Sequence, residues 1–147
     1  MEKMELLAPA GDLEKLKIAI DYGADAVYFG GPMFGLRAGA GNLNIEEMKE
    51  GLDYAHARGV KAYMTVNVFA HNEDIKLLPG YLESLKGLPI DAFLVSDPGV
   101  FMIFKQVLPD AEIHLSTQAN TTNYMTANFW YRQGVKRIVA AREMSFK

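Results

Sequence analysis

Small polar side chains follow the short apolar runs of this chain, and several carry groups that could bind a ligand or move a proton. Amides and hydroxyls hydrogen-bond polar ligands, arginines bind anions, and carboxylates and imidazoles exchange protons. The predicted ligand-binding residues are Arg37, Asn67, His71, Asn72, Ser96, Gln118, Asn120 and Arg142. The candidates for catalysis are Asp97, His114, Ser116 and Glu143.

The catalytic candidates also have structural alternatives. Asp97 precedes Pro98-Gly99, so its carboxylate either contacts a ligand or caps a helix. His114 lies within an apolar run, where it is either a hydrogen-bonded core residue or a base. Ser116 lacks the glycine-flanked elbow of a nucleophilic serine, so the sequence does not indicate a Ser–His–acid triad.

The loop residues leave similar alternatives open. Arg37 either clamps an anionic ligand or is a solvated surface residue. His71 is either a general base or proton shuttle, or a lone loop histidine. Gly30-Gly31 either lets a phosphate approach the backbone or forms a tight turn. The aromatic residues at 124, 130 and 131 either pack in the core or stack on bases.

An alternation of apolar runs and amphipathic segments must position these residues. The predicted strands are Met4–Ala8, Ala26–Phe29, Ala62–Phe69, Ala92–Val95, Glu112–Thr117 and Arg137–Ala141. The predicted helices are Leu13–Tyr22, Ile45–Arg58, Ile75–Lys86, Val100–Val107 and Thr121–Gln133. We expect Pro79 near the first turn of the third helix, and Thr121 or Thr122 as the cap of the last.

Repeated βα units give parallel strands, either in an open doubly wound sheet or in part of an eight-stranded barrel. Tyr63, Thr65 and Asn67 share one face of the third strand, and His114 and Ser116 share one face of the fifth. A polar face suits a barrel lumen, whereas a central strand of an open sheet is apolar on both faces. We therefore predict an α/β fold, an incomplete TIM-type (βα) barrel with about six parallel strands and five helices.

Composition sets broad limits on function. The 147 residues are 50% apolar, which is enough for a core and too apolar for disorder. Without cysteine the chain forms no disulfide, thiolate metal site or cysteine nucleophile, and its spacing of His, Asp and Glu predicts no metal site. The net charge of −3 does not by itself indicate a nucleic-acid binder. We expect one cytoplasmic domain over residues 1–147, without a secretory leader or membrane span.

Several strings of residues together resemble the N-terminal region of the U32 peptidase family, the collagenase-like proteases. The strings are Glu5–Gly11, Asp25–Gly31, Ala55-His56, Asn67, His71-Asn72, Ser96–Gly99, His114–Asn120 and Ala141–Glu143. The resemblance runs over essentially the whole chain, and the His-Leu-Ser-Thr-Gln-Ala-Asn string is its most specific part. It implies a barrel-type N-terminal domain of a longer protein, because a closed barrel takes about 250 residues.

The resemblance implies two kinds of activity. Some members are described as peptidases, and others act in hydroxylation of transfer RNA uridine, ribosomal RNA cytidine or ubiquinone. The resemblance implies that the hydroxylating members use an iron–sulfur cluster, held by cysteines downstream of the region that this chain matches. Because this chain has no cysteine, we expect no cofactor within it. A peptidase is the leading interpretation, and an RNA-hydroxylation protein or a non-catalytic assembly module is the alternative. We expect a peptide or RNA substrate, and a homo-oligomer formed through unpaired sheet edges.

Overall fold

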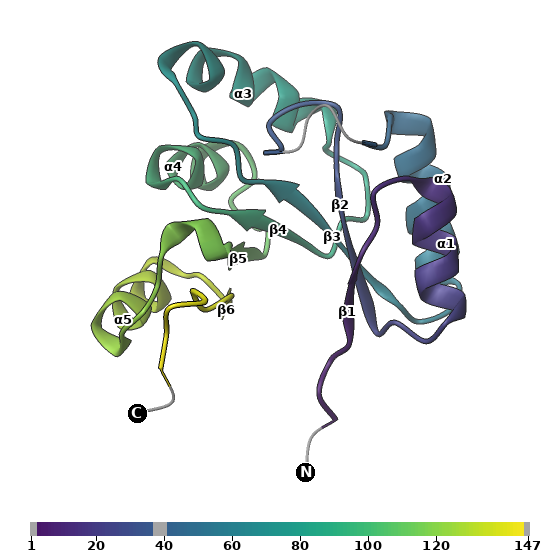
Figure 1. The fold of residues 1–147 in the computed structure, drawn as a ribbon. Coiled ribbons are helices and arrows are strands. Elements are labelled where there is room, and N and C mark those ends of the chain that lie inside the picture. The colour runs from purple at the N-terminus through teal and green to yellow at the C-terminus, as the bar shows by residue number, and fades with distance from the viewer. Residues whose placement is uncertain (1–2, 37–40, 146–147) are drawn as a thin grey trace. The chain divides into compact units, whose positions relative to one another are not determined.

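The computed structural model describes residues 3–36 and 41–145, over which six strands alternate with five α-helices (Figure 1). The strands are β1 (Leu7–Pro9), β2 (Ala26–Gly30), β3 (Lys61–Val66), β4 (Ala92–Val95), β5 (Ile113–Leu115) and β6 (Arg137–Ile138). The helices are α1 (Leu13–Asp21), α2 (Ile45–His56), α3 (Asn72–Ser84), α4 (Pro98–Val107) and α5 (Tyr124–Gln133), with a 3₁₀ turn η1 (Thr117–Ala119). The predicted βα alternation is confirmed.

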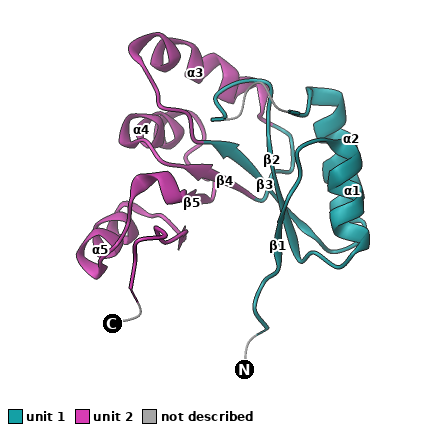
Figure 2. Ribbon diagram, viewed as in Figure 1, with its two compact units in different colours: residues 1–66, 87–91 teal, residues 67–86, 92–147 magenta. Residues whose placement is uncertain are grey.

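The chain falls into two compact units (Figure 2). The first comprises residues 1–66 and 87–91 and holds β1 to β3 with α1 and α2. The second comprises residues 67–86 and 92–147 and holds β4 to β6 with α3, α4, α5 and η1.

All described strand pairs are parallel, and neighbouring strands follow chain order within each unit. In the first unit Leu7 is in register with Ala26, and Ala26 with Lys61. In the second, β4 pairs with β5, and β5 with β6. Sequential parallel order is that of a βα barrel, whereas a doubly wound sheet reverses its order at a switch point.

The core of the first unit lies between its strands and its two helices. Leu16 of α1 and Met48 of α2 are fully buried, as are Ala26 and Ala62 of the strands. Gly51 lets the helices approach closely, because a Cβ there would lie 3.0 Å from Cδ1 of Leu16. The burial pattern therefore confirms that the apolar faces of these predicted helices form the core.

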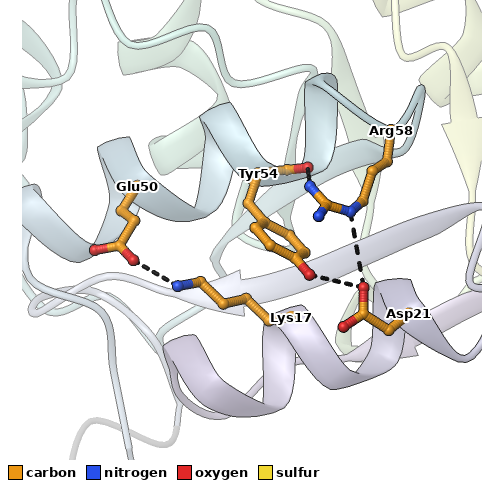
Figure 3. Close-up of polar contacts among 5 residues, drawn as sticks. All are labelled: Lys17, Asp21, Glu50, Tyr54 and Arg58. Atoms are coloured by element: carbon orange, nitrogen blue, oxygen red, sulfur yellow. Dashed lines mark hydrogen bonds and ion pairs between the residues drawn. The ribbon is translucent and has the colours of Figure 1, made fainter.

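A polar network joins the outer faces of α1 and α2 (Figure 3). The hydroxyl of Tyr54 donates to Oδ1 of Asp21 at 2.7 Å, and the Arg58 guanidinium lies 3.5 Å from the centroid of the Tyr54 ring. Lys17 Nζ lies 2.5 Å from Oε1 of Glu50. These contacts link the two helices at the surface, where each ion pair contributes at most about 1 kcal/mol.

Aromatic side chains dominate the core of the second unit. Phe93 of β4 packs on Phe104 of α4 with ring centroids 4.9 Å apart. Phe101 of α4 meets the edge of Trp130 of α5 at 5.6 Å. Trp130 is thus a packing residue, while Tyr124 and Tyr131 on the same helix are exposed. Of the three aromatic residues at 124, 130 and 131, only Trp130 therefore packs in the core, which was one of the two predicted alternatives.

Three helix starts differ from the predicted ones, and α4 begins at Pro98, two residues before the predicted Val100. Helix α3 begins at Asn72 rather than Ile75, and the backbone N–H of His71 donates to Oδ2 of Asp74 at 2.8 Å. Pro79 therefore lies inside the helix and not in its first turn. A proline inside a helix removes one backbone hydrogen bond, and burial of the apolar face of α3 offsets the loss of stability. Helix α5 begins at Tyr124, because the side chain of Asn123, and not a threonine, caps it.

Three strands end before their predicted ends. β3 ends at Val66 rather than Phe69, and β6 at Ile138 rather than Ala141. β5 ends at Leu115, because the chain turns there into η1. Among the described residues, no helix is both long enough and apolar enough to cross a membrane.

Candidate functional site

An amide and hydroxyl cluster lies at the carboxyl ends of β4 and β5. The side chain of Asn67 donates through Nδ2 to Oε1 of Gln118 at 3.4 Å, and the hydroxyl of Ser116 donates to the same oxygen. Ser96 donates its hydroxyl to the backbone carbonyl of Asn67 at 3.4 Å. Four predicted residues, separated by up to 51 positions in sequence, therefore meet within the second unit.

The backbone after β5 fixes this cluster. The N–H of Ser116 donates to the carbonyl of Val95 at 2.8 Å, which places Ser116 beside the end of β4. Residues 117–119 then form the 3₁₀ turn η1, which places Gln118 two residues after Ser116. The turn ends at Asn120, whose φ of 53° is in the left-handed region that asparagine tolerates. Asn120 itself is exposed.

The segment after β6 is tied to the same loop. The hydroxyl of Thr117 donates to the carbonyl of Ala140 at 3.4 Å, and the N–H of Ala141 donates to the carbonyl of Thr121 at 3.1 Å. Arg142 and Glu143 follow in an exposed turn. The structure thus connects the backbone that carries these two residues to the loop that carries Gln118.

Thr121 was not among the residues predicted to bind a ligand or to act in catalysis. It is 3% exposed, and among the described residues its hydroxyl has no hydrogen-bond partner. A buried hydroxyl is normally bonded. Its place directly after the Ser-Thr-Gln-Ala-Asn string was the available signal, but a helix cap explained it equally well.

Asp97 and His71 both lie at helix starts. Oδ1 of Asp97 accepts from the backbone N–H of Val100 at 2.9 Å, so Asp97 is the N-cap of α4. His71 precedes α3 and Asn72 is its first residue, and both side chains are exposed. The capping alternative for Asp97 is observed, and its catalytic role stays a prediction.

His114 is buried in β5. It is 2% exposed, and its Nε2 lies 2.8 Å from Oε1 of Glu112, which directly precedes the strand. This partner lies before the strand's amino end, whereas the ligand cluster lies at the carboxyl end. The contact matches the hydrogen-bonded core alternative, and a role as base stays a prediction.

The glycine-rich loop can be followed in part. A Cβ at Gly30 would lie 2.6 Å from Oδ1 of Asn42, so a larger residue at the end of β2 would displace this side chain. The carbonyl of Gly30 accepts from the N–H of Leu43 at 3.0 Å. Close packing explains Gly30 without a phosphate. Arg37, predicted to bind an anion, lies outside the described residues.

The amide and hydroxyl cluster can bind a ligand through hydrogen bonds from uncharged side chains. Within the described ranges, no three His, Asp or Glu side chains are grouped to hold a metal ion. The cysteine-ligated iron–sulfur cluster that the family resemblance implies does not fit these residues, because the chain supplies no thiolate. The cluster suits a polar, uncharged group such as a peptide or a nucleobase.

The sequence profile of peptidase family U32 matches residues 11–147. The chain is 48% identical over 144 residues to tRNA hydroxylation protein P1 of Bacillus subtilis, covering 98% of this chain and 34% of that relative. It is 50% identical over 146 residues to tRNA hydroxylation protein P of Helicobacter pylori, covering 99% and 35%. The chain thus spans about a third of the length of these two curated relatives.

The structural likeness agrees with the sequence match. The fold is similar to that of the U32 peptidase Mk0906, with a TM-score of 0.73 and 16% identity over 95% of this chain and 61% of that one. The chain belongs to peptidase family U32. The predicted family and the predicted fold class, an incomplete α/β barrel with six parallel strands and five helices, are both confirmed.

Proposed function

We propose that this chain is the base-binding portion of an RNA-hydroxylation protein, which works on transfer RNA in the cytoplasm. The observation that carries the proposal is identity of 48% and 50%, over nearly the whole chain, to two tRNA hydroxylation proteins. The amide and hydroxyl cluster around Gln118 supports it, because such groups hydrogen-bond the edges of unpaired bases.

The charge distribution supports the same proposal. Residues 98–147 contain six Lys or Arg and three Asp or Glu, a local net charge of +3, although the whole chain carries −3. Arg132, Lys136 and Arg142 in this stretch are exposed. Cations beside a polar site attract the phosphates of RNA. The composition of the whole chain conceals this local excess.

The contacts of the catalytic candidates weigh against the peptidase interpretation. Ser116 donates its hydroxyl to Gln118, and His114 lies beside Glu112, so these contacts form no serine–histidine relay. Asp97 caps α4. RNA hydroxylation, an alternative from the sequence, is therefore preferred here to proteolysis, the leading interpretation from the sequence.

In this proposal, oxidation depends on groups outside the 147 residues. Cysteine-held clusters need thiolates, which this chain lacks. Within the chain, Gln118 and Asn67 bind and orient the base, and Ser116 holds Gln118 in place.

The test is nucleoside mass spectrometry of RNA from a strain that lacks the gene encoding this chain. We expect one hydroxylated base to disappear from transfer RNA and to return when the gene is restored. A restored gene carrying Gln118→Leu is expected to return it incompletely. If every hydroxylated base persists in the deletion strain, the proposal is wrong.

We also propose self-association through the outer strands. In the described units β1 pairs only with β2, and β6 only with β5, so each has an edge that could accept another strand. Sedimentation equilibrium is expected to show a concentration-dependent dimer. A stable monomer at high concentration would contradict this.

A further inference from the structure

A hollow on the surface of the second unit lies along one side of α5, away from the amide and hydroxyl cluster. It has a volume of about 380 Å³ and is lined by Met125, Asn128, Phe129, Arg132 and Gln133. These positions recur at the spacing of successive helical turns, so their side chains share one side of the helix. Small-ligand sites begin at roughly 300 Å³, so this α5 hollow is large enough for one nucleotide.

Phe129 supplies an aromatic surface to the α5 hollow. Its side chain is 56% exposed, although phenylalanine is usually buried. Its ring meets the edge of the Trp130 ring with centroids 5.4 Å apart, and Trp130 is 7% exposed and packs on Phe101 of α4. The core therefore supports Phe129 from one side and leaves part of its ring open to a ligand.

The other lining residues are mostly polar. In the part of the chain that the structure describes, the side chains of Asn128, Arg132 and Gln133 make no hydrogen bond or ion pair. The seam between two packed helices is apolar at these spacings, whereas three of the five residues here are polar. The composition of the hollow therefore favours a planar ligand with polar edges over a second helix.

Positive charge gathers at the last turn of α5. The helix contains no Asp or Glu, and Arg132 lies in its last turn. Nζ of Lys105 lies 3.6 Å from the place that a Cβ of Gly134 would take, which puts this ammonium group beside the end of the helix. Lys136, which follows, is exposed. The charge of this surface is therefore complementary to an anionic ligand.

We propose that the α5 hollow binds a nucleotide of single-stranded RNA, with the base stacked on Phe129 and the phosphate paired with Arg132. The inference rests on the proposed RNA function and adds a second contact with the RNA. The amides of Asn128 and Gln133 present both donors and acceptors, so they suit any base edge. Stacking is also tolerant of sequence, because every base has a π-face. The hollow therefore holds the strand without selecting a base.

The experiment measures fluorescence anisotropy of an end-labelled oligouridine of about six nucleotides, titrated with the 147-residue chain. An abasic oligonucleotide of the same length carries the same phosphates and no bases. We expect it to bind at least about 5-fold more weakly, the value of one stacked base. Equal binding of the two oligonucleotides, or no binding of the RNA, would overturn the inference.

Phe129→Leu keeps an apolar side chain and removes the π-face. It should weaken binding of oligouridine at least about 5-fold and leave binding of the abasic oligonucleotide nearly unchanged. Tyr131→Leu, at an exposed aromatic residue of α5 outside the hollow, is the matched control and should bind like the parent. Thermal unfolding shows whether each variant keeps its fold. Parent-like RNA binding by a folded Phe129→Leu would refute the stacking.

Arg132→Gln tests the phosphate contact independently, because this side chain is exposed and its loss leaves the core intact. Affinity for a single strand falls with salt in proportion to the phosphates neutralised, so the slope of log affinity against log salt should decrease by about 0.7. Lys61→Gln, at an exposed lysine of the first unit, is the control and should leave the slope unchanged. An unchanged slope in Arg132→Gln would refute the contact.

A second copy of the chain is the competing occupant of the hollow. A dimer that Phe129→Leu abolishes in sedimentation, together with absence of RNA binding, would overturn the inference in favour of a protein interface. Loss of a hydroxylated base in the deletion strain, with equal RNA binding by Phe129→Leu and the parent, would refute this inference alone. Persistence of every hydroxylated base would refute the proposed function instead.

Discussion

Tyr54 donates its phenolic hydrogen to Asp21 across 2.7 Å, which joins α2 to α1 (Figure 3). This hydrogen bond to a carboxylate favours the neutral phenol and raises the pKa of Tyr54 above its usual value. Tyr54 therefore stabilises the folded chain below about pH 10, and that contribution is lost as the pH rises through the raised pKa.

The pH dependence of Tyr54 gives the first prediction. Asp21→Asn should lower the pKa of Tyr54 towards that of a free tyrosine, because the acceptor loses its charge. The measurement is an NMR titration of ring-labelled tyrosine, with the Tyr54 signal assigned from Tyr54→Phe. Tyr124→Phe, at an exposed tyrosine, is the control for assignment. An unchanged pKa in Asp21→Asn would contradict the prediction.

The second prediction concerns acid stability and Asp25. Lys3 Nζ donates to its carboxylate at 2.6 Å and the N–H of Leu6 at 2.8 Å, and these bonds lower the pKa of Asp25. A lowered pKa stabilises the fold above the unfolded value of about 3.9, and this is lost as the pH falls through the folded value. Asp25→Asn should therefore be less stable than the parent near neutral pH, with the gap narrowing in acid.

Urea unfolding at about pH 7 and about pH 3 measures this difference. Asp110→Asn, at an exposed residue, serves as the control and should leave the pH dependence nearly unchanged. A constant stability gap between Asp25→Asn and the parent at both pH values would show that the carboxylate does not act through its ionisation.

A pair of glycines gives the third prediction. Gly41 has a φ of +61°, and a Cβ there would lie 2.5 Å from the carbonyl oxygen of Gly11, so Gly41→Ala should destabilise by at least about 1–2 kcal/mol. Gly80 lies inside α3 with open space around it, so Gly80→Ala should stabilise by roughly 0.5–1 kcal/mol. Thermal unfolding of both variants checks the opposite signs.

Asp97 carries the fourth prediction. Asp97→Ala should destabilise by about 1 kcal/mol because α4 loses its N-cap, whereas Asp97→Ser keeps a capping oxygen and should cost much less. If Asp97 is only a cap, Asp97→Ser keeps the RNA hydroxylation measured in the complemented deletion strain. Loss of hydroxylation in a stable Asp97→Ser protein would instead support the predicted catalytic role.

The sequence allowed the element order to be predicted because each βα unit repeats the same local pattern. It also placed Asn67, Ser96, Ser116 and Gln118 correctly at strand ends, since residues in parallel strands share an edge. It could not reveal which side chain each would bond, because that depends on the turn after Leu115 and on backbone pairing between distant segments. Pro79 was misplaced because tertiary burial outweighed its local cost.

The bond between Asn67 and Gln118 spans 51 residues of sequence. Contacts of such separation form late in folding, because the loop between them must close first and parallel strands need a crossover each time. During synthesis Gln118 can reach Asn67 only after β5 and η1 have left the ribosome. A partly folded chain therefore lacks this polar cluster, which is complete only when the second unit has folded.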